Sequence, residues 1–414
     1  MILQAHPTGN ANVRHAALAL AQAGLLGEFH TCLAPAPDAV WLRLLPAALR
    51  RQALRRAIPS ELVGRTRIRP ARELGRLVFS ALGWTRWLRP EAGPCCIDTV
   101  YRDLDEASAR RLRSQHPRFT AVYAYEDGAD ALFATARELG VPTIYDLPIG
   151  YWRFARRLLV EEAELSPEWA GTLGGLRDSE SKLARKDREL AQADAVFVAS
   201  SFTRATLAEA PDTPKKIIVI PYGAPTPLAG MEPARRAPGD PLRVLFVGSL
   251  GQRKGLRYLL EAVESLGTTC TLTLIGTVPD APCAPLASAL RRHRHIVSLP
   301  HAEILAEMRR HHVFVFPSLF EGFGLVLLEA MSCGLPLIAT PHTAAPDVIT
   351  EGREGSIVPI RDSKAIAERL ATLASDEDRR YAQACAAIAR ARELTWERYR
   401  SILAREVTLV IKPD

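Results

Sequence analysis

The chain alternates short apolar runs with amphipathic helical patterns, and it does so in two successive series. Such alternation is typical of a parallel α/β sheet, in which each strand is followed by a helix that covers it. The stretch 221–241, PYGAPTPLAGMEPARRAPGDP, separates the two series and is dense in proline, glycine and small residues. The pattern predicts two doubly wound Rossmann-like α/β domains, and 414 residues are enough for two cores.

The first domain is expected over 1–225, a linker over 226–241 and the second domain over 242–393. The expected strands are 29–34, 119–125, 141–147, 195–200, 216–221, 242–248, 271–276, 295–299, 312–317, 335–339 and 356–358. The expected helices lie near 9–25, 104–114, 128–139, 180–193, 255–266, 301–310, 324–333, 345–350, 363–374 and 377–393. Because doubly wound sheets bind ligands beyond the carboxyl ends of their strands, we expect the site in a cleft between the domains.

Segment 41–90 carries the basic charge of the chain. It holds twelve arginines against Glu61 and Glu73, a net charge of 12 − 2 = +10, whereas the whole chain sums to +7. Tryptophans and leucines alternate with these arginines, a mixture that suits an anionic membrane surface. The alternative is a helical excursion whose arginines are solvated or paired with the acidic remainder. No nucleic-acid-binding motif accompanies the cluster, so no nucleic-acid partner is expected.

Other sequence features bound the compartment and the chemistry. No apolar run approaches the length of a membrane-spanning helix, and the first residues lack the pattern of a signal peptide, so a cytoplasmic location is expected. The seven cysteines are scattered without a C-x-x-C pair. Neither a disulfide framework nor structural zinc is therefore expected.

The most informative stretch is 313–340, VFVFPSLFEGFGLVLLEAMSCGLPLIAT. A buried strand is followed by Glu321 and by glycines that open a helix, so backbone N–H groups and the helix dipole favour a phosphate there. Glu321 and Glu329 lie up to about 12 Å apart on a helix, too far to act as the close carboxylate pair of a retaining glycosidase. They suit the two hydroxyl-rich ends of a nucleotide sugar. The alternative is that Glu321 caps the helix and Glu329 lies on the surface.

These residues resemble a known signature. Glu321-Gly322-Phe323-Gly324 through Glu329, followed by Gly334-Leu335-Pro336, is similar to the E-x7-E motif of the family 4 retaining glycosyltransferases, which have the GT-B fold. Matching pieces follow the family's order at 196–207, 219–223, 244–263 and 272–276. The resemblance covers the second half of the chain and, more weakly, the first half.

The resemblance implies roles for individual residues. Arg253 and Lys254 match the basic pair that grips the donor diphosphate, and fixed cations suit the charge that builds on that leaving group. Glu321 matches the glutamate that contacts the donor sugar and Glu329 the one that holds the ribose. The remaining donor-binding residues implied in the second half are Gly248, Ser249, Gly322, Phe323, Gly324 and Leu325.

The first half departs from the family pattern in two places. Gly9 and Asn10 stand where the family usually has two glycines near the donor phosphate, and asparagine tolerates positive φ better than most residues. A family histidine near the sugar is absent, and Glu126 or Asp127 is a candidate to replace it at the sugar or the acceptor. The alternative is that both only cap a helix. His6 is a further candidate to line the cleft, or else a structural imidazole.

No metal or other cofactor is expected. Asp103 and Asp105 have the D-x-D spacing of metal-dependent glycosyltransferases, but they precede a helical run in which aspartate is a common cap. The resemblance implies the same, because GT-B enzymes supply their cations as side chains.

The resemblance implies a hexosyltransferase. A nucleoside-diphosphate sugar would donate to a hydroxyl of a glycan or lipid-linked acceptor with retention, in cell-surface polysaccharide biosynthesis. The segment 394–414 resembles the closing helix that crosses back to the first domain, and 41–90 would dock peripherally on the cytosolic face of the inner membrane. The alternatives are a sugar-nucleotide epimerase and a non-catalytic partner of GT-B fold that binds sugar nucleotides or lipid.

Overall fold

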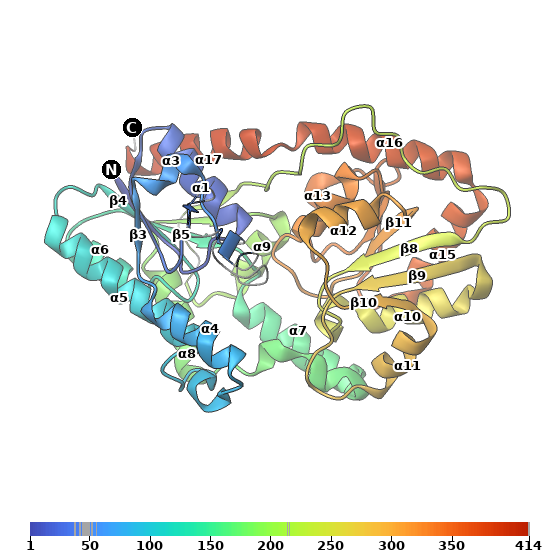
Figure 1. Ribbon diagram of the computed structural model, residues 1–414, viewed down its shortest axis with the longest axis horizontal. Coiled ribbons are helices and arrows are strands. Elements are labelled where there is room, and N and C mark those ends of the chain that lie inside the picture. The colour runs from blue at the N-terminus through green and yellow to red at the C-terminus, as the bar shows by residue number, and fades with distance from the viewer. Residues whose placement is uncertain are drawn as a thin grey trace.

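The computed structural model describes residues 1–414 except 37–38, 41–42, 44–49, 51–52, 55, 213, 215 and 413–414. Within the described residues, the first half forms a seven-stranded parallel sheet in the order β3-β2-β1-β4-β5-β6-β7 (Figure 1). Its strands are β1 Ile2–Ala5, β2 Leu26–Thr31, β3 Thr66–Ile68, β4 Ala121–Tyr125, β5 Thr143–Leu147, β6 Ala195–Val198 and β7 Ile217–Val219. The described part of the second half forms a six-stranded parallel sheet in the order β10-β9-β8-β11-β12-β13. Its strands are β8 Leu242–Val247, β9 Cys270–Ile275, β10 Arg294–Ile296, β11 Val313–Phe316, β12 Leu337–Ala339 and β13 Gly355–Ile357.

Helices cover both faces of each sheet, which confirms the expected doubly wound architecture. In the first half they are α1 Ala11–Gln22, α3 Ser60–Val63, α4 Ala71–Ala81, η2 Thr85–Leu88, α5 Ile97–Gln115, α6 Asp130–Glu138, α7 Trp152–Leu165, η3 Pro167–Thr172, η4 Gly174–Leu176, α8 Glu180–Ala191, α9 Ser201–Thr206 and η5 Leu207–Glu209. In the second half they are η6 Gln252–Lys254, α10 Leu256–Ser265, η7 Gly267–Thr269, α11 Ala284–Arg292, α12 His301–Met308, α13 Leu325–Ser332, α14 Ala345–Val348, α15 Ser363–Ser375, α16 Glu377–Glu393 and α17 Trp396–Ile411.

Strand β1 lies inside the first sheet, between β2 and β4, yet it is not among the strands expected from the sequence. It has only four residues, and Gln4 interrupts their apolar character. The Gln4 amide is fully buried and donates to the hydroxyl of Tyr125 over 3.2 Å. The amide nitrogen of this buried side chain is thus hydrogen-bonded, as burial of a polar group requires, whereas its Oε1 has no hydrogen-bond partner among the described residues.

Both sheets reverse their strand order at one point. In the first sheet β1 pairs with β2 on one side and β4 on the other, and in the second β8 pairs with β9 and β11. Loops at such a reversal diverge to opposite faces and leave a crevice in which ligands bind. The loops after β1, β4, β8 and β11 are therefore the places to look for a site.

The chain crosses between the domains at two neighbouring places. The N–H of Ala224 donates to the carbonyl of Leu394 over 2.6 Å, so the outgoing and returning segments run side by side. Beyond the return, α17 lies against α1, and the Trp396 ring stacks on His15 at 4.0 Å between centroids. In Figure 1 the red helices α16 and α17 span the top of both domains.

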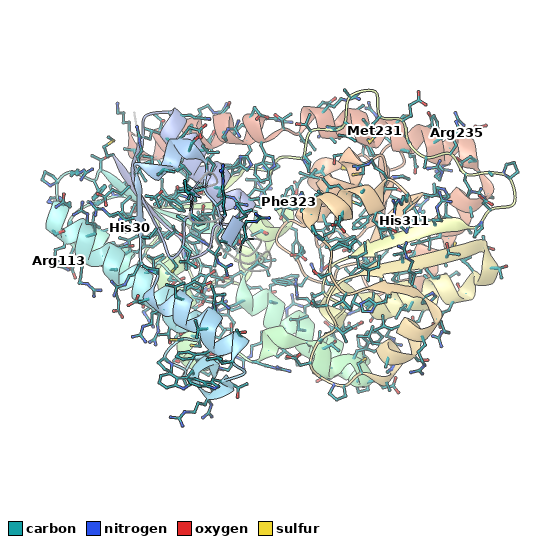
Figure 2. The ribbon with its side chains drawn as sticks, in the orientation of Figure 1. His30, Arg113, Met231, Arg235, His311 and Phe323 are labelled. Carbon is teal, nitrogen blue, oxygen red and sulfur yellow. The ribbon has the colours of Figure 1, made fainter. Side chains whose placement is uncertain are left out.

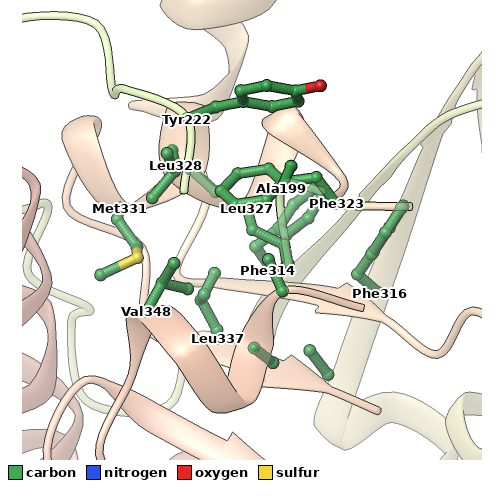
Figure 3. Close-up of a cluster of buried hydrophobic side chains, with 14 of the residues drawn as sticks. Ala199, Tyr222, Phe314, Phe316, Phe323, Leu327, Leu328, Met331, Leu337 and Val348 are labelled. Carbon is green, nitrogen blue, oxygen red and sulfur yellow. The ribbon is translucent and has the colours of Figure 1, made fainter. Parts of the chain in front are cut away.

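The apolar core is continuous from one domain to the other. Figure 3 shows side chains of α13 and β11 packed together with Ala199 and Tyr222 from the first half of the chain. Leu327, Leu328 and Met331 of α13 are all fully buried, so little of this helix faces solvent. Burying each such side chain contributes about 1.5–3 kcal/mol, which fixes α13 firmly in the second domain.

The basic segment 41–90 is partly tied into the first domain, and 41–42, 44–49, 51–52 and 55 lie outside the described residues. Arg56 and Arg76 pair with the buried Glu73. Further arginines bind elsewhere in the domain: Arg65 the Leu26 carbonyl, Arg67 Glu28, Arg69 Asp103 and Arg72 the Pro94 carbonyl. Arg67 and Arg69 of this set therefore pair with acidic residues outside the segment, whereas the others bind Glu73 of the segment itself or backbone carbonyls.

Asp146 of β5 provides a test of the packing under α17. It lies beside a small cavity lined also by Tyr399 and Leu403, and it accepts a hydrogen bond from Tyr123 over 2.7 Å. Burial raises its pKa from 3.8 to about 7. The unfolded chain thus holds fewer protons at this group between pH 4 and 7, so wild-type stability falls there as pH rises.

The Asp146→Asn variant lacks this titration. We expect its free energy of unfolding to rise relative to wild type by up to about 1.4 kcal/mol per pH unit between pH 4 and 7. Urea unfolding of both proteins across this range measures the difference. A difference that does not change with pH would contradict the burial of an uncharged carboxyl at this position.

Candidate functional site

A cavity of about 410 Å³ lies in the cleft between the domains, a volume in the range of small-molecule sites. Its lining includes the loops after β1, β8 and β11, as the strand order requires. Of the residues predicted from the sequence, it is lined by His6, Asn10, Gly248, Lys254, Glu321, Phe323, Gly324, Leu325 and Glu329. The structure thus brings most of the predicted donor-binding residues together.

Lys254 and Glu321 form an ion pair inside the cavity, between Nζ and Oε2. Arg253 lies beside them: its guanidinium donates to the carbonyl of Phe320 over 2.7 Å and is 3.4 Å from the Glu321 carboxylate. Burial would raise the pKa of Glu321, but the charges of Lys254 and Arg253 outweigh it and hold that pKa below its ordinary value. Burial lowers the pKa of Lys254, against the opposing effect of Glu321. The arrangement places a paired carboxylate and two cations at one end of the cleft.

Glu329 projects from α13 into the same cavity. The neighbouring side chains of α13 are buried in the apolar core, so a charged residue is tolerated only on the face of the helix that lines the cleft. Its Oε1 lies 3.0 Å from Nε2 of His301, and this hydrogen bond raises the pKa of the histidine. Gly324 precedes the helix with φ +82°, a left-handed conformation that favours glycine.

The loop after β1 differs from its expected conformation. Neither Gly9 nor Asn10 has positive φ, and Asn10 is extended with φ −63°. The tolerance of asparagine for positive φ is therefore not used here. His6 lines the cavity, accepts the N–H of Thr8 at Nδ1 over 3.0 Å, and has its pKa lowered by burial to about 4. His6 is consequently a neutral imidazole at ordinary pH.

The two domains meet in backbone contact at the end of this cavity. A Cβ atom on Gly322 would lie 1.8 Å from the carbonyl oxygen of Pro148, and one on Gly150 would lie 2.6 Å from the Phe320 ring. The carbonyl of Gly322 also accepts a hydrogen bond from Thr203 over 3.0 Å. Only glycine permits this approach, which seats the turn after β11 on the first domain.

Glu126 and Asp127 do not line the cavity that holds Glu321 and Glu329. Glu126 lines a second cavity of about 210 Å³, which it shares with Arg253 but not with Glu321. Its carboxylate is 3.4 Å from Nζ of Lys186, and burial raises its pKa. Asp127 contacts Arg185 on the same helix, α8. Neither residue caps α6, so that alternative is wrong.

The N-terminus of α6 is capped from another helix. The carboxylate of Asp105 accepts the N–H groups of Ala131 and Leu132 over 2.7 and 2.9 Å. Asp103 instead pairs with Arg69. The two aspartates of the D-x-D spacing are thus engaged separately. Among the described residues, no group of three or more His, Cys, Asp or Glu side chains is placed to hold a metal ion.

Several residues that line the cavity were not predicted from the sequence. Asn12, in the first turn of α1, donates from Nδ2 to the hydroxyl of Tyr222 over 3.2 Å, and both residues line the cavity. The Tyr222 ring lies 5.0 Å from Phe323, which Figure 2 shows at the junction of the domains. Tyr222 stands in the VIPYG piece that resembles the family, and that was the available signal. Nothing in the spacing of Asn12 or Pro148 pointed to the cleft.

Comparison with known proteins identifies the second half of the chain. Residues 241–376 match the model of the family described as glycosyl transferases group 1. These residues are therefore similar to a glycosyl transferases group 1 domain. The domain spans the six-stranded sheet and contributes Lys254, Glu321 and Glu329 to the cavity.

Curated relatives match over part of their length. The chain is 31% identical over 256 residues to the D-inositol 3-phosphate glycosyltransferase of Corynebacterium urealyticum, covering 54% of this chain and 58% of that one. It is 30% identical over 162 residues to the O-antigen chain mannosyltransferase B of Escherichia coli, covering 37% and 42%. The chain therefore spans about half the length of these relatives.

Solved structures match over nearly the whole chain. The sucrose-phosphate synthase of Thermosynechococcus elongatus aligns with a TM-score of 0.63 and 20% identity, covering 98% of this chain and 97% of that one. HepE of Anabaena in complex with UDP aligns with a TM-score of 0.60 and 15% identity, covering 98% and 99%. This likeness confirms the GT-B fold expected from the sequence.

The glycine contact at the end of the cleft can be tested directly. In Gly322→Ala the new methyl group overlaps the Pro148 carbonyl, so the domains must shift apart, at a cost of about 1–3 kcal/mol for overpacking. Differential scanning calorimetry should show a lower melting temperature. Gly64→Ala is the matched control, because its Cβ would meet nothing within 4 Å. Equal melting temperatures for the two variants would show that the contact is not close.

Proposed function

We propose that the protein is a retaining glycosyltransferase. It transfers a sugar from a nucleoside-diphosphate sugar to a hydroxyl of a glycan or lipid-linked acceptor, in cell-surface polysaccharide biosynthesis. The observation that carries the proposal is the cleft cavity of about 410 Å³, in which Lys254, Glu321 and Glu329 of the second domain face His6 and Asn10 of the first domain. The relative named as an O-antigen chain mannosyltransferase supports a glycan acceptor.

The diphosphate of the donor would bind at the cations and at the start of α13. Lys254, Arg253 and the positive end of the helix dipole all favour the negative charge that grows on the leaving diphosphate. The loop after β8 contributes Gly248 to the lining of the same cavity, whereas Ser249 does not line it. Since the cations are side chains, the proposal requires no metal and no other cofactor.

Glu321 and Glu329 would hold the two hydroxyl-rich ends of the donor. Glu329 is 21% exposed and, with His301, suits the ribose hydroxyls. Glu321 is bound to Lys254 in the structure, and an arriving diphosphate would compete for that cation. Its carboxylate would then be released toward the donor sugar, which couples donor binding to sugar positioning.

Transfer with retention needs no strong protein base. The bond from C1 to the leaving phosphate oxygen breaks while the acceptor oxygen bonds to C1 on the same face, and the leaving oxygen takes the acceptor proton. The neutral His6 is placed to hydrogen-bond the sugar or the acceptor without carrying a charge. Closure of the two domains would exclude water and protect the donor from hydrolysis.

The donor can be identified with a panel of UDP-, GDP- and ADP-sugars. We expect one of them to raise the melting temperature and to be hydrolysed slowly. Glu321→Gln should lose about 10²–10³-fold in hydrolysis, because it alters the group at the reacting sugar. Glu329→Gln is the matched comparison and should mainly weaken donor binding.

Each other outcome favours a different function. Interconversion of the donor without an acceptor would indicate an epimerase. Binding without hydrolysis or transfer would indicate a non-catalytic sugar-nucleotide partner. A protein that binds no member of the panel would contradict the proposal.

We further propose a cytoplasmic protein that attaches peripherally to the cytosolic face of the inner membrane. The supporting surface is α4 with η2, where Leu74, Val78 and Leu82 follow one another at helical spacing and are about half exposed, next to the exposed Trp84. Arg86 and Arg89 are exposed beside them. Such a face combines apolar and cationic groups, as an anionic lipid surface requires. No helix in the described part of the chain is long and apolar enough to cross a bilayer.

Vesicle flotation tests this docking surface. Wild type should float with vesicles that contain phosphatidylglycerol and less with pure phosphatidylcholine. Replacing Leu74, Val78 and Leu82 together by serine should abolish flotation, because it removes the apolar contact. The control replaces Leu228, Val278 and Val297, which are exposed elsewhere, by serine. Equal flotation of the two triple variants would contradict docking through α4.

A further inference from the structure

Helix α7 and η3 stand between two strands of the first sheet in sequence, yet they are bound to the second domain. Arg257 donates to the carbonyl of Leu165 over 2.9 Å and to the hydroxyl of Ser166 over 2.8 Å. The hydroxyl of Thr172 accepts the N–H of Gln252 over 3.0 Å. Residues 165–172 therefore hold the segment 252–257 of the second domain, which follows β8, in place.

Glu162 is the centre of this attachment. Its side chain is 0% exposed. Its carboxylate accepts hydrogen bonds from Arg361 Nε over 2.8 Å, from the Tyr258 hydroxyl over 2.9 Å and from the Ser166 hydroxyl over 2.9 Å. Burial, together with this carboxylate, raises the pKa of Tyr258 to about 12, so the tyrosine stays a donor. A carboxylate this buried is maintained only with its partners in place.

The same carboxylate holds Gln252, which adjoins the two cations of the cleft. Nε2 of Gln252 donates to Glu162 over 2.6 Å, and its Oε1 accepts the N–H of Arg257 over 3.1 Å. Gln252 is fully buried and begins the short helix η6, whose next residues are Arg253 and Lys254. In one turn of 3₁₀-helix the neighbours cannot move independently, so the anchor of Gln252 also sets the position of both cations.

We propose that Glu162 is a positioning residue for the donor diphosphate, acting through Gln252 on Arg253 and Lys254. Glu162 lies in the half of the chain that forms the first sheet. A residue outside the matched range 241–376 would thus help to position the cations that bind the diphosphate. Glu162 itself does not line the cleft cavity. The inference rests on the proposed function, because it assigns the η6 cations to a diphosphate.

Glu162→Gln tests the inference, since it keeps the size of the side chain and removes its charge. Amide hydrogen exchange of the ligand-free protein should become faster over 249–255. Affinity for inorganic pyrophosphate, measured by calorimetry below the unfolding transition, should fall by about tenfold to a hundredfold, as expected for misplaced binding groups. Thr172→Val removes the other anchor of Gln252 and should change both readouts in the same direction, even if Glu162→Gln does not fold.

Glu161→Gln is the matched control. Glu161 is half exposed and pairs with Arg361 but has no bond to Gln252, so this variant should keep wild-type exchange and affinity. Unchanged exchange and affinity in both Glu162→Gln and Thr172→Val would overturn the inference. Wild type that does not bind pyrophosphate would count against the proposed function, whereas exchange over 249–255 would still decide whether Glu162 holds the loop.

Discussion

The structure depends on the backbone contact between Gly322 and the Pro148–Gly150 loop. It brings the carboxyl ends of two parallel sheets close enough to share one cavity, because Gly322 meets the backbone of Pro148 directly while the Phe320 ring packs on Gly150. Ser201 and Asp347 extend the contact, with the Asp347 carboxylate accepting the N–H and the hydroxyl of Ser201. Loops from both strand-order reversals therefore face one another, and the charged side chains they carry act on one ligand volume.

Buried charge is arranged on both sides of this contact. On one side Lys254 and Arg253 hold Glu321 ionised, and on the other Lys186 lies between Glu126 and Asp127. Each group is compensated by a partner, as burial in a region of low dielectric requires. A ligand that carries its own negative charge can exchange partners within such a set, whereas a neutral ligand cannot. This is the physical reason for preferring a diphosphate at the Lys254 end of the cleft.

The sequence predicted the order and type of the helices and strands well, but it predicted less well which residues lie next to one another in space. Apolar runs located β4, β5, β8, β9 and β11 to within a few residues because most residues of these strands are buried. It missed β1, whose buried Gln4 donates a hydrogen bond to Tyr125 far along the chain. The motif after β11 located Glu321 and Glu329, since the glycines and the helix start are local. The sequence could not show that Glu126 lines a different cavity from Glu321 and Glu329. The cavities are formed by contacts such as the one between Pro148 and Gly322, which are about 170 positions apart in the chain.

The sequence by itself determined what is local: two alternating α/β series, a linker, a phosphate-favouring helix start and a cluster of arginines. These follow from hydrophobic period, glycine geometry and charge, each readable within a few residues. Only the tertiary structure decided which arginines are bound internally, which residues share the cleft, and that Glu162 supports a loop of the other domain. Those outcomes depend on contacts between distant segments, where burial makes a single hydrogen bond or ion pair decisive.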